Sequence, residues 1–166
     1  MTIRNTLRGA YRTSSSCSTQ TRVFSISIKT RFTGTCYCGE TKFQVNEETV
    51  PYFSCYCHCE SCRRAHSSPL YQVVYIPRAD FELLNPEHIT LFKKQDKAVT
   101  RAFCNVCGTR MYNLLQHKAD WLGFFPNLFD DQKLLKPLPE RFQPTEHYCS
   151  EESVIPLHLL QDGLTR

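Results

Sequence analysis

Short strand-like patterns dominate the chain beyond residue 40. Polar and apolar residues alternate at positions 41–45, and residues 71–76 combine aromatic with β-branched side chains before Pro77 ends the run. Alternation of this kind is typical of strands that bury one face. The same reasoning predicts further short strands at residues 81–84, 89–92, 99–103 and 109–115, with a weaker candidate at residues 153–160.

Helical patterns are scarce by comparison. Beyond the first 30 residues no apolar period of 3.6 residues extends over more than two turns, and residues 60–65 predict a single helical turn. Turn residues such as Asn85-Pro86 and Pro126-Asn127 separate the strand candidates. The predicted fold class is therefore mainly β, a small domain of short antiparallel sheets with long loops.

The first 30 residues differ in composition from the rest. Six basic residues and no acidic residue occur between Met1 and Gly39, whereas 14 basic and 16 acidic residues follow from Glu40 onward. This Ser-rich, Arg-rich segment resembles a mitochondrial transit peptide, with arginines on one face of an amphipathic helix at Arg4, Arg8 and Arg12. We therefore divide the chain into a leader, residues 1–30, and a folded domain, residues 31–166. The expected location is the mitochondrial matrix, with the cytoplasm as the alternative.

The charge distribution argues against two classes of partner. The formal net charge of the chain is +4, but the residues from Glu40 onward sum to −2. A nucleic-acid-binding domain needs a basic face of its own. No apolar run approaches the roughly 18–20 residues that a membrane-spanning helix needs. We therefore expect no nucleic acid and no membrane partner, and the oligomeric state stays open.

Ten cysteines in 166 residues indicate either a disulfide framework or metal ligation. Disulfides require an oxidising compartment, yet the N-terminus lacks the apolar core of a secretory signal. The cysteines also occur in tight Cys-x-Cys and Cys-x-x-Cys pairs, a spacing that suits chelation of one ion. Metal ligation, with zinc as the ion, is the favoured interpretation.

Two of the cysteine pairs form matching halves of one site. Cys104 and Cys107 are followed by Gly108, which can take the positive φ that turns the chain back over a metal ion. Cys36 and Cys38 are also followed by a glycine, and each pair lies at the end of a candidate strand. Together they predict a closed, four-cysteine zinc site with a structural role. A redox-active Cys-x-x-Cys pair is the alternative.

A middle cluster supplies a second candidate site. Cys57, Cys59 and Cys62 lie on one short segment and can hold an ion as a tripod, with the fourth tetrahedral position free for water or substrate. A filled fourth position would instead make the site structural. The residues that can fill it are Cys55, His58 and His66.

The division of cysteines between the two sites has an alternative that spacing does not exclude. In it, Cys57 and Cys59 join the half-site that contains Cys104, and Cys62 joins the first pair, Cys36 and Cys38. Two further cysteines fit neither pattern and are expected to be free thiols: Cys17 and Cys149.

These motifs resemble those of the glutathione-dependent formaldehyde-activating enzyme family, which includes centromere protein V. Three ordered segments carry the resemblance: Gly34-Thr35-Cys36-Tyr37-Cys38-Gly39, then Cys57-His58-Cys59-Glu60-Ser61-Cys62-Arg63-Arg64, then Phe103-Cys104-Asn105-Val106-Cys107-Gly108-Thr109. Weaker resemblance at residues 122–130, 144–148 and 162–164 extends it to about residues 31–166. The sequence departs from the family pattern at Cys55, an extra thiol beside the middle segment.

The resemblance implies a β-tent fold of small sheets that carries two zinc ions. The implied ligands are Cys36, Cys38, Cys104 and Cys107 for a structural zinc, and Cys57, Cys59 and Cys62 for a second zinc at the active site. The implied activity joins glutathione, as co-substrate, to formaldehyde and gives S-(hydroxymethyl)glutathione. In reverse, this reaction is that of a carbon–sulfur lyase.

On this hypothesis the open zinc position takes the glutathione sulfur as a thiolate, which adds to formaldehyde or a related small electrophile. The product alkoxide would take its proton from water, His58 or His66. Arg63 and Arg64 are candidates to bind the glutathione carboxylates through bidentate hydrogen bonds. The alternatives are a non-catalytic zinc module that acts as a protein-interaction or structural subunit, and a glutathione carrier. The mildly acidic domain favours small-molecule thiol and aldehyde substrates over the interaction module.

Overall fold

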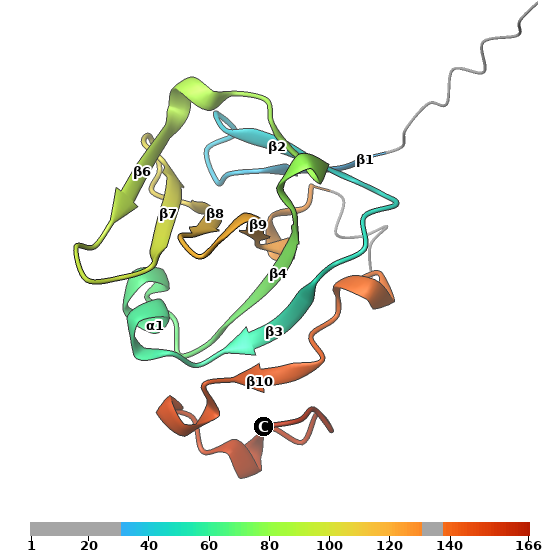
Figure 1. The fold of residues 1–166 in the computed structure, drawn as a ribbon, viewed down its shortest axis with the longest axis vertical. Coiled ribbons are helices and arrows are strands. Elements are labelled where there is room, and N and C mark those ends of the chain that lie inside the picture. The colour runs from blue at the N-terminus through green and yellow to red at the C-terminus, as the bar shows by residue number, and fades with distance from the viewer. Residues whose placement is uncertain (1–30, 131–137) are drawn as a thin grey trace, which may run out of the picture.

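The computed structural model describes residues 31–130 and 138–166 (Figure 1). The predicted leader, with Cys17, lies outside the described residues. The described strands are β1 (Arg31–Thr35), β2 (Lys42–Asn46), β3 (Phe53–Cys57), β4 (Tyr71–Pro77), β5 (Phe81–Leu83), β6 (Ile89–Lys93), β7 (Val99–Cys104), β8 (Arg110–Leu115), β9 (Lys118–Phe124) and β10 (Glu146–Tyr148). The α-helix is α1 (Glu60–His66), and the 3-10 turns are η1 (Arg78–Asp80), η2 (Pro86–His88), η3 (Pro126–Leu128), η4 (Glu140–Phe142), η5 (Ser150–Glu152) and η6 (Leu157–Leu159).

Two sheets form the domain. β1, β2 and β5 make a three-stranded sheet, and the other strands make a larger sheet in the order β10-β3-β4-β9-β8-β7-β6. All neighbours are antiparallel except β10, which runs parallel to β3 with Tyr148 opposite Cys57. In Figure 1, β1 and β2 lie at one end of the domain and β10 at the other. The mainly β fold class is confirmed, with the β3–β10 pair as an exception to antiparallel pairing.

The core between the sheets is built largely from phenylalanine. Phe43 on β2 has no exposed surface, and its ring stacks on Phe81 of β5 at a centroid distance of 5.0 Å. From the larger sheet, the ring of Phe124 on β9 meets Phe129 at 5.4 Å and the edge of Phe142 at 5.6 Å. Full burial of such a side chain contributes about 1.5–3 kcal/mol. The aromatic cluster therefore holds the two sheets together.

Six of the predicted strands are confirmed, as β2, β4, β5, β6, β7 and β8, and the predicted helical turn is α1. The predicted strand at residues 153–160 is wrong, because this segment contains the 3-10 turn η6 instead. Pro156 precedes that turn, and proline has no backbone N–H to donate to a neighbouring strand. None of the helices in the described ranges is long and apolar enough to cross a membrane.

Gly34 provides a test of the packing between β1 and β2. A Cβ added at this position would lie 2.2 Å from Cζ of the buried Phe43 ring. Because the ring is enclosed by the aromatic cluster, we expect Gly34→Ala to lower the free energy of unfolding by about 1–3 kcal/mol. Urea denaturation measures this change, with Thr33→Ala, an exposed position on the same strand, as the control. Equal stability of the two variants would contradict the packing described.

Candidate functional site

Four cysteines from both sheets gather at one point. Cys36 and Cys38 follow β1, Cys104 ends β7, and Cys107 lies in the turn before β8. Their four Sγ atoms all lie within 4.8 Å of one another, with 3.4 Å between Cys36 and Cys38 and 3.8 Å between Cys38 and Cys104. A tetrahedral zinc site with Zn–S bonds of about 2.3 Å requires S–S separations of about 3.8 Å. The four residues therefore fit a tetrahedral metal site.

Local backbone geometry prepares both halves of this four-cysteine cluster. Gly39 and Gly108 have φ values of +86° and +76°, a conformation that favours glycine. The Gly108 N–H donates to the carbonyl of Cys104 at 2.9 Å, which closes that turn. The Thr109 hydroxyl lies 3.1 Å from Cys107 Sγ and accepts from the N–H of Tyr37 at 3.2 Å. Thr109 thus links the two halves.

Hydrogen bonds also prepare one of these thiols for metal binding. Burial alone would raise the pKa of Cys107, but hydrogen bonds from the Thr109 hydroxyl and from backbone N–H groups outweigh it and lower this pKa to about 6. Metal ligation requires the thiolate form of cysteine. The environment of Cys107 therefore favours the form that a metal ion binds.

Cys57, Cys59 and Cys62 are placed by β3 and the start of α1. Cys57 ends β3, Cys59 precedes the helix, and Cys62 lies within its first turn. The carbonyl of Cys59 accepts the N–H groups of Cys62 and Arg63, at 3.0 and 2.9 Å. The three sulfurs do not all lie within 4.8 Å of one another, so this group is looser than the four-cysteine cluster. Its side chains instead share the wall of a cavity.

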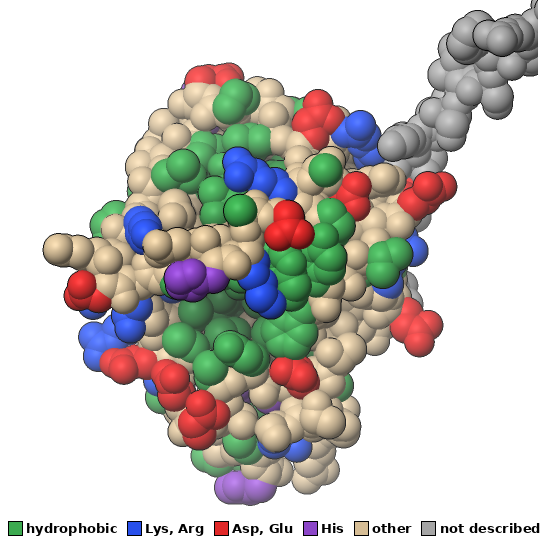
Figure 2. All heavy atoms as spheres, viewed as in Figure 1, with side chains coloured by type: hydrophobic (Ala, Val, Ile, Leu, Met, Phe, Trp, Pro, Cys, Tyr) green, Lys and Arg blue, Asp and Glu red, His purple; other side chains and the backbone are tan. Residues whose placement is uncertain are grey.

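This cysteine cavity has a volume of about 500 Å³ and a largely aromatic wall. Figure 2 shows a hollow lined by hydrophobic side chains near the middle of that face. At its rim Tyr52 stacks on Trp121 at 4.6 Å, and Nζ of Lys118 lies 3.5 Å from the centre of the Trp121 ring. The full lining is Tyr52, Phe53, Cys55, Cys57, Cys59, Cys62, Tyr71, Val73, Tyr75, Val99, Leu115, Lys118, Trp121, Glu146 and Tyr148.

Cys62 is the thiol of this cavity whose surroundings favour the thiolate. The Cys57 thiol donates to its sulfur, and this lowers the pKa of Cys62 to about 5 against the opposing effect of burial. The Tyr71 hydroxyl and the Arg101 guanidinium add to the lowering, with Arg101 Nη2 at 3.7 Å from Sγ. Burial raises the pKa of Cys55 to about 12, so this extra thiol stays protonated at neutral pH.

Arg63 and Arg64, the residues predicted to bind glutathione, lie on α1 and do not line the cysteine cavity. Arg63 donates from Nε to the carbonyl of His58 at 2.8 Å and from Nη2 to the carbonyl of Glu152 at 3.0 Å. Arg64 forms an exposed ion pair with Glu60 at 2.7 Å. Their role in glutathione binding stays a prediction.

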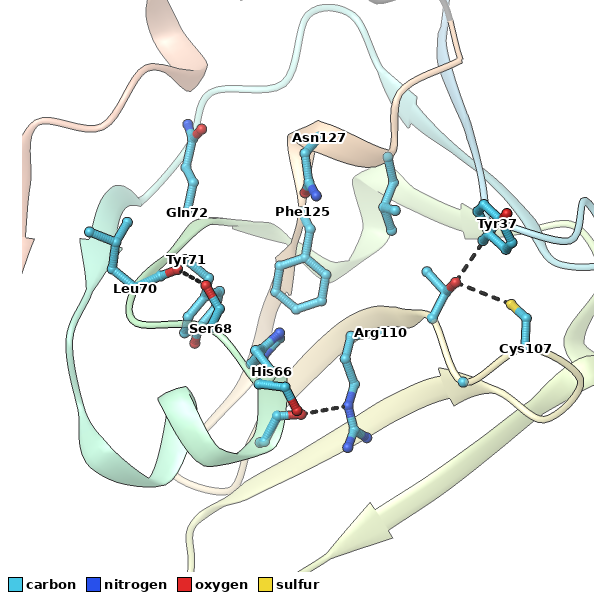
Figure 3. Close-up of a pocket in the computed structure, with 15 residues that line it drawn as sticks. Tyr37, His66, Ser68, Leu70, Tyr71, Gln72, Cys107, Arg110, Phe125 and Asn127 are labelled. Carbon is cyan, nitrogen blue, oxygen red and sulfur yellow. Dashed lines mark hydrogen bonds between the residues drawn. The ribbon is translucent and has the colours of Figure 1, made fainter. Parts of the chain in front are cut away.

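The two predicted proton donors are not among the residues that line this cavity. His58 is buried, and its Nε2 lies 2.8 Å from Nδ1 of His147, whose Nε2 in turn lies 2.7 Å from Oδ2 of Asp162. His66 stacks on Tyr71 at 4.0 Å and lines a separate pocket (Figure 3). Burial, with a contribution from nearby arginines, lowers the pKa of His66 to about 4. The lowered pKa favours the neutral imidazole at physiological pH.

Sequence reasoning did not single out Tyr71, Arg101, His147 or Asp162 as functional residues. Tyr71 and Arg101 stand inside predicted strands, where alternation alone assigns them only to a face. For Arg101 the sequence offered one indication of a functional role, which is an arginine in a largely apolar predicted strand. A buried charge of this kind needs a partner.

Comparison with known proteins supports the family resemblance that the cysteine motifs indicate. The sequence model of the family described as "Glutathione-dependent formaldehyde-activating enzyme" matches residues 31–149. The chain belongs to this family. No curated protein matches the chain. A crystal structure of a Rhodobacter sphaeroides protein, a structural genomics target, is similar in fold, with a TM-score of 0.50 and 20% identity over 61% of this chain and 94% of that chain.

For this member of the glutathione-dependent formaldehyde-activating enzyme family, the four-cysteine cluster predicts a metal that stabilises the fold. We expect Cys107→Ser to lose one bound zinc ion and to lower the free energy of unfolding by on the order of 5 kcal/mol. Zinc content and thermal unfolding measure both effects, with Val106→Ala as the control, because Val106 is exposed in the same turn and offers no ligand atom. A Cys107→Ser protein with unchanged zinc content would contradict the assignment.

A series of side-chain hydrogen bonds from His58 through His147 to Asp162 connects the segment that follows β3 to the C-terminal residues of this family member. We expect His147→Phe to lower the free energy of unfolding by about 1–3 kcal/mol, because it leaves the buried Nε2 of His58 unpaired. Chemical denaturation tests this, with the exposed His158→Phe as the matched control. A loss of stability no larger than that of the control would show that the hydrogen bonds do not support this segment.

Proposed function

We propose that the protein is a zinc-dependent enzyme of the carbon–sulfur lyase type. It would join glutathione to formaldehyde or a related small electrophile, as an S-(hydroxymethyl)glutathione synthase does, and split the adduct in reverse. The observation that carries the proposal is the cysteine cavity, onto which Cys57, Cys59 and Cys62 all open. Family membership supports the same chemistry.

The donor atoms of this cavity suit zinc. Three thiolates from one segment are soft ligands that zinc accepts, and Cys57, Cys59 and Cys62 would hold the ion. When bound, zinc would lower the pKa of a thiol that joins it and so supply a nucleophile at neutral pH. A second zinc, held by the four-cysteine cluster, would have a structural role.

Neighbouring side chains would keep the ligands of the cavity in the required charge state. Arg101 and the Tyr71 hydroxyl stabilise negative charge on Cys62. Without such donors, a buried cysteine would stay in the protonated thiol form. These two residues are therefore proposed as positioning residues for the Cys62 ligand.

The aromatic wall of the cavity would favour addition of a thiol over addition of water. Val73, Tyr71 and Tyr75 of β4 pack beside the cysteines and limit the water that can compete for the electrophile. Formaldehyde has two non-hydrogen atoms and would fill only a small part of about 500 Å³. The remaining volume can hold the thiol partner or a larger aldehyde.

The exposed rim of the cavity offers donors for the proton that the product requires. Tyr148 is half-exposed there, and Lys118 lies at the same opening. Charges and hydroxyl groups at a rim contact water, so the proton can be replaced from solvent. Neither His58 nor His66 is needed for this step, which agrees with their absence from the lining of the cavity.

A single substitution tests this proposal. We expect Cys59→Ser to weaken zinc-dependent glutathione binding and to reduce the rate of S-(hydroxymethyl)glutathione formation by about 100-fold or more, because it removes one of three ligands. Calorimetry measures binding, and exchange NMR measures the rate above the uncatalysed background. Val106→Ala, at an exposed side chain that offers no ligand atom, is the control.

Three results would contradict the enzyme proposal in different ways. A zinc-loaded protein that does not bind glutathione would favour the non-catalytic zinc module. Binding without any rate above the background would favour the glutathione carrier. An unchanged rate in Cys59→Ser would show that the reaction does not use this ligand set.

A further inference from the structure

A second cavity, of about 610 Å³, lies between α1 and the strands β6, β7 and β8. Cys59 lines both this pocket and the cysteine cavity, so the two meet at that thiol. The pocket is mostly basic, and we call it the basic pocket. Its charged lining residues are Arg64, Lys94, Lys97, Arg101 and Arg110, with Glu60 and Glu152 as the acidic residues.

Arg101 carries a buried charge without an acidic partner. Its side chain is on β7 with 4% of the residue exposed, and its Nε has no hydrogen-bond partner. Nη2 lies 3.4 Å from the hydroxyl of Ser61 and 3.7 Å from Cys62 Sγ. Within residues 31–130 and 138–166, no carboxylate forms an ion pair with it. A buried guanidinium in this position lacks much of the stabilisation that an anion would give it.

Arg110 adds a second guanidinium from the neighbouring strand. Figure 3 shows its side chain extending from β8 toward the end of α1, where Nε donates to the carbonyl of Ala65 at 2.9 Å. Burial and the charge of Arg101 both lower the pKa of Arg110, which reflects the cost of holding two like charges close together. Within the described residues Arg110 also has no ion pair.

The acidic residues of the pocket are already engaged. Glu60 pairs with Arg64 at 2.7 Å, and a carboxylate oxygen of Glu152 accepts the backbone N–H of Glu60 at 2.6 Å. Lys94 and Lys97 are exposed at the pocket and have no ion pair among the described residues. The basic pocket therefore has an excess of positive charge that its own acids do not neutralise.

We propose that the basic pocket binds the carboxylate end of the thiol co-substrate, while the thiol itself reaches Cys59 at the shared wall. This inference rests on the proposed function. Guanidinium groups bind carboxylates through paired N–H donors, and glutathione carries two carboxylates and a net negative charge. A role of Arg101 as counter-ion to the cysteine thiolates alone would account for Arg101, but not for Arg110, Lys94 and Lys97.

Two probes separate the carboxylate from the thiol. S-methylglutathione keeps both carboxylates but has no free thiol, whereas cysteamine has a thiol and no carboxylate. Each is titrated by calorimetry into the zinc-loaded full-length protein. The variants are the Lys94→Gln/Lys97→Gln double variant and Arg110→Gln, and Lys93→Gln is the matched control, since Lys93 is exposed on β6 and does not line the pocket.

We expect S-methylglutathione to bind about fivefold more weakly to the double lysine variant and about tenfold or more weakly to Arg110→Gln. Its affinity for Lys93→Gln should stay within about twofold, and cysteamine, a cation without a carboxylate, should not bind more weakly to any of the variants. Added salt should weaken S-methylglutathione more than cysteamine. The double lysine variant changes only exposed side chains, so it keeps the test valid where Arg110→Gln lowers stability.

The outcomes separate this proposal from the proposed function. S-methylglutathione binding that persists in Cys59→Ser and falls in the lysine variant supports the basic pocket even where the lyase reaction fails. Equal binding of S-methylglutathione to all variants overturns the pocket, whatever glutathione does. Binding of sulfate at the pocket without binding of S-methylglutathione also overturns it, because the pocket would then take a free anion rather than the co-substrate.

Discussion

The close approach of four cysteine sulfurs is the constraint on which both cavities depend. Four thiols within 4.8 Å of one another cannot all carry a negative charge unless a cation neutralises them. The cluster joins the end of β1 in the small sheet to the turn between β7 and β8 in the large one. β7 also carries Arg101 and β8 carries Arg110, so a metal ion in the cluster would help to fix the positions of both guanidinium groups.

Hydrogen bonds from the C-terminal residues give the cysteine cavity a second support. Two sets of hydrogen bonds hold the segment after β3. The backbone N–H of His58 donates to the carbonyl of Tyr148 at 2.9 Å, and the His58 side chain is hydrogen-bonded to His147, which is hydrogen-bonded to Asp162. The C-terminal residues thus fix a loop that lies about 90 residues earlier in the sequence. The positions of Cys57 and Cys59 therefore depend on these hydrogen bonds as well as on any metal ion that the two residues bind.

The sequence missed β1, β3 and β9, which contain cysteine or glycine, and the three-residue strand β10. β3 places Phe53, Cys55 and Cys57 on one face, but a run of cysteines indicates ligands before it indicates a strand. β9 contains Gly123, which lowers strand propensity yet is required because a Cβ there would lie 2.7 Å from the Tyr75 ring. Spacing and resemblance together selected the four residues that the fold gathers into one cluster, whereas contacts between elements far apart in the sequence, such as that of Arg101 on β7 with Cys62 on α1, leave no local pattern.

The same limit explains why the sequence directed attention to Arg63 and Arg64. An arginine pair next to the ligands is visible in one dimension, and in the folded domain Arg63 donates to two backbone carbonyls while Arg64, which lines the basic pocket, pairs with Glu60. Arg101 lies far along the chain from the cysteine segment and is brought beside it by β7. A guanidinium that keeps no carboxylate partner after folding has charge left for a ligand, and one that is already paired has much less. The folded charge balance therefore shows which arginines keep unpaired charge, and proximity in sequence alone does not show it.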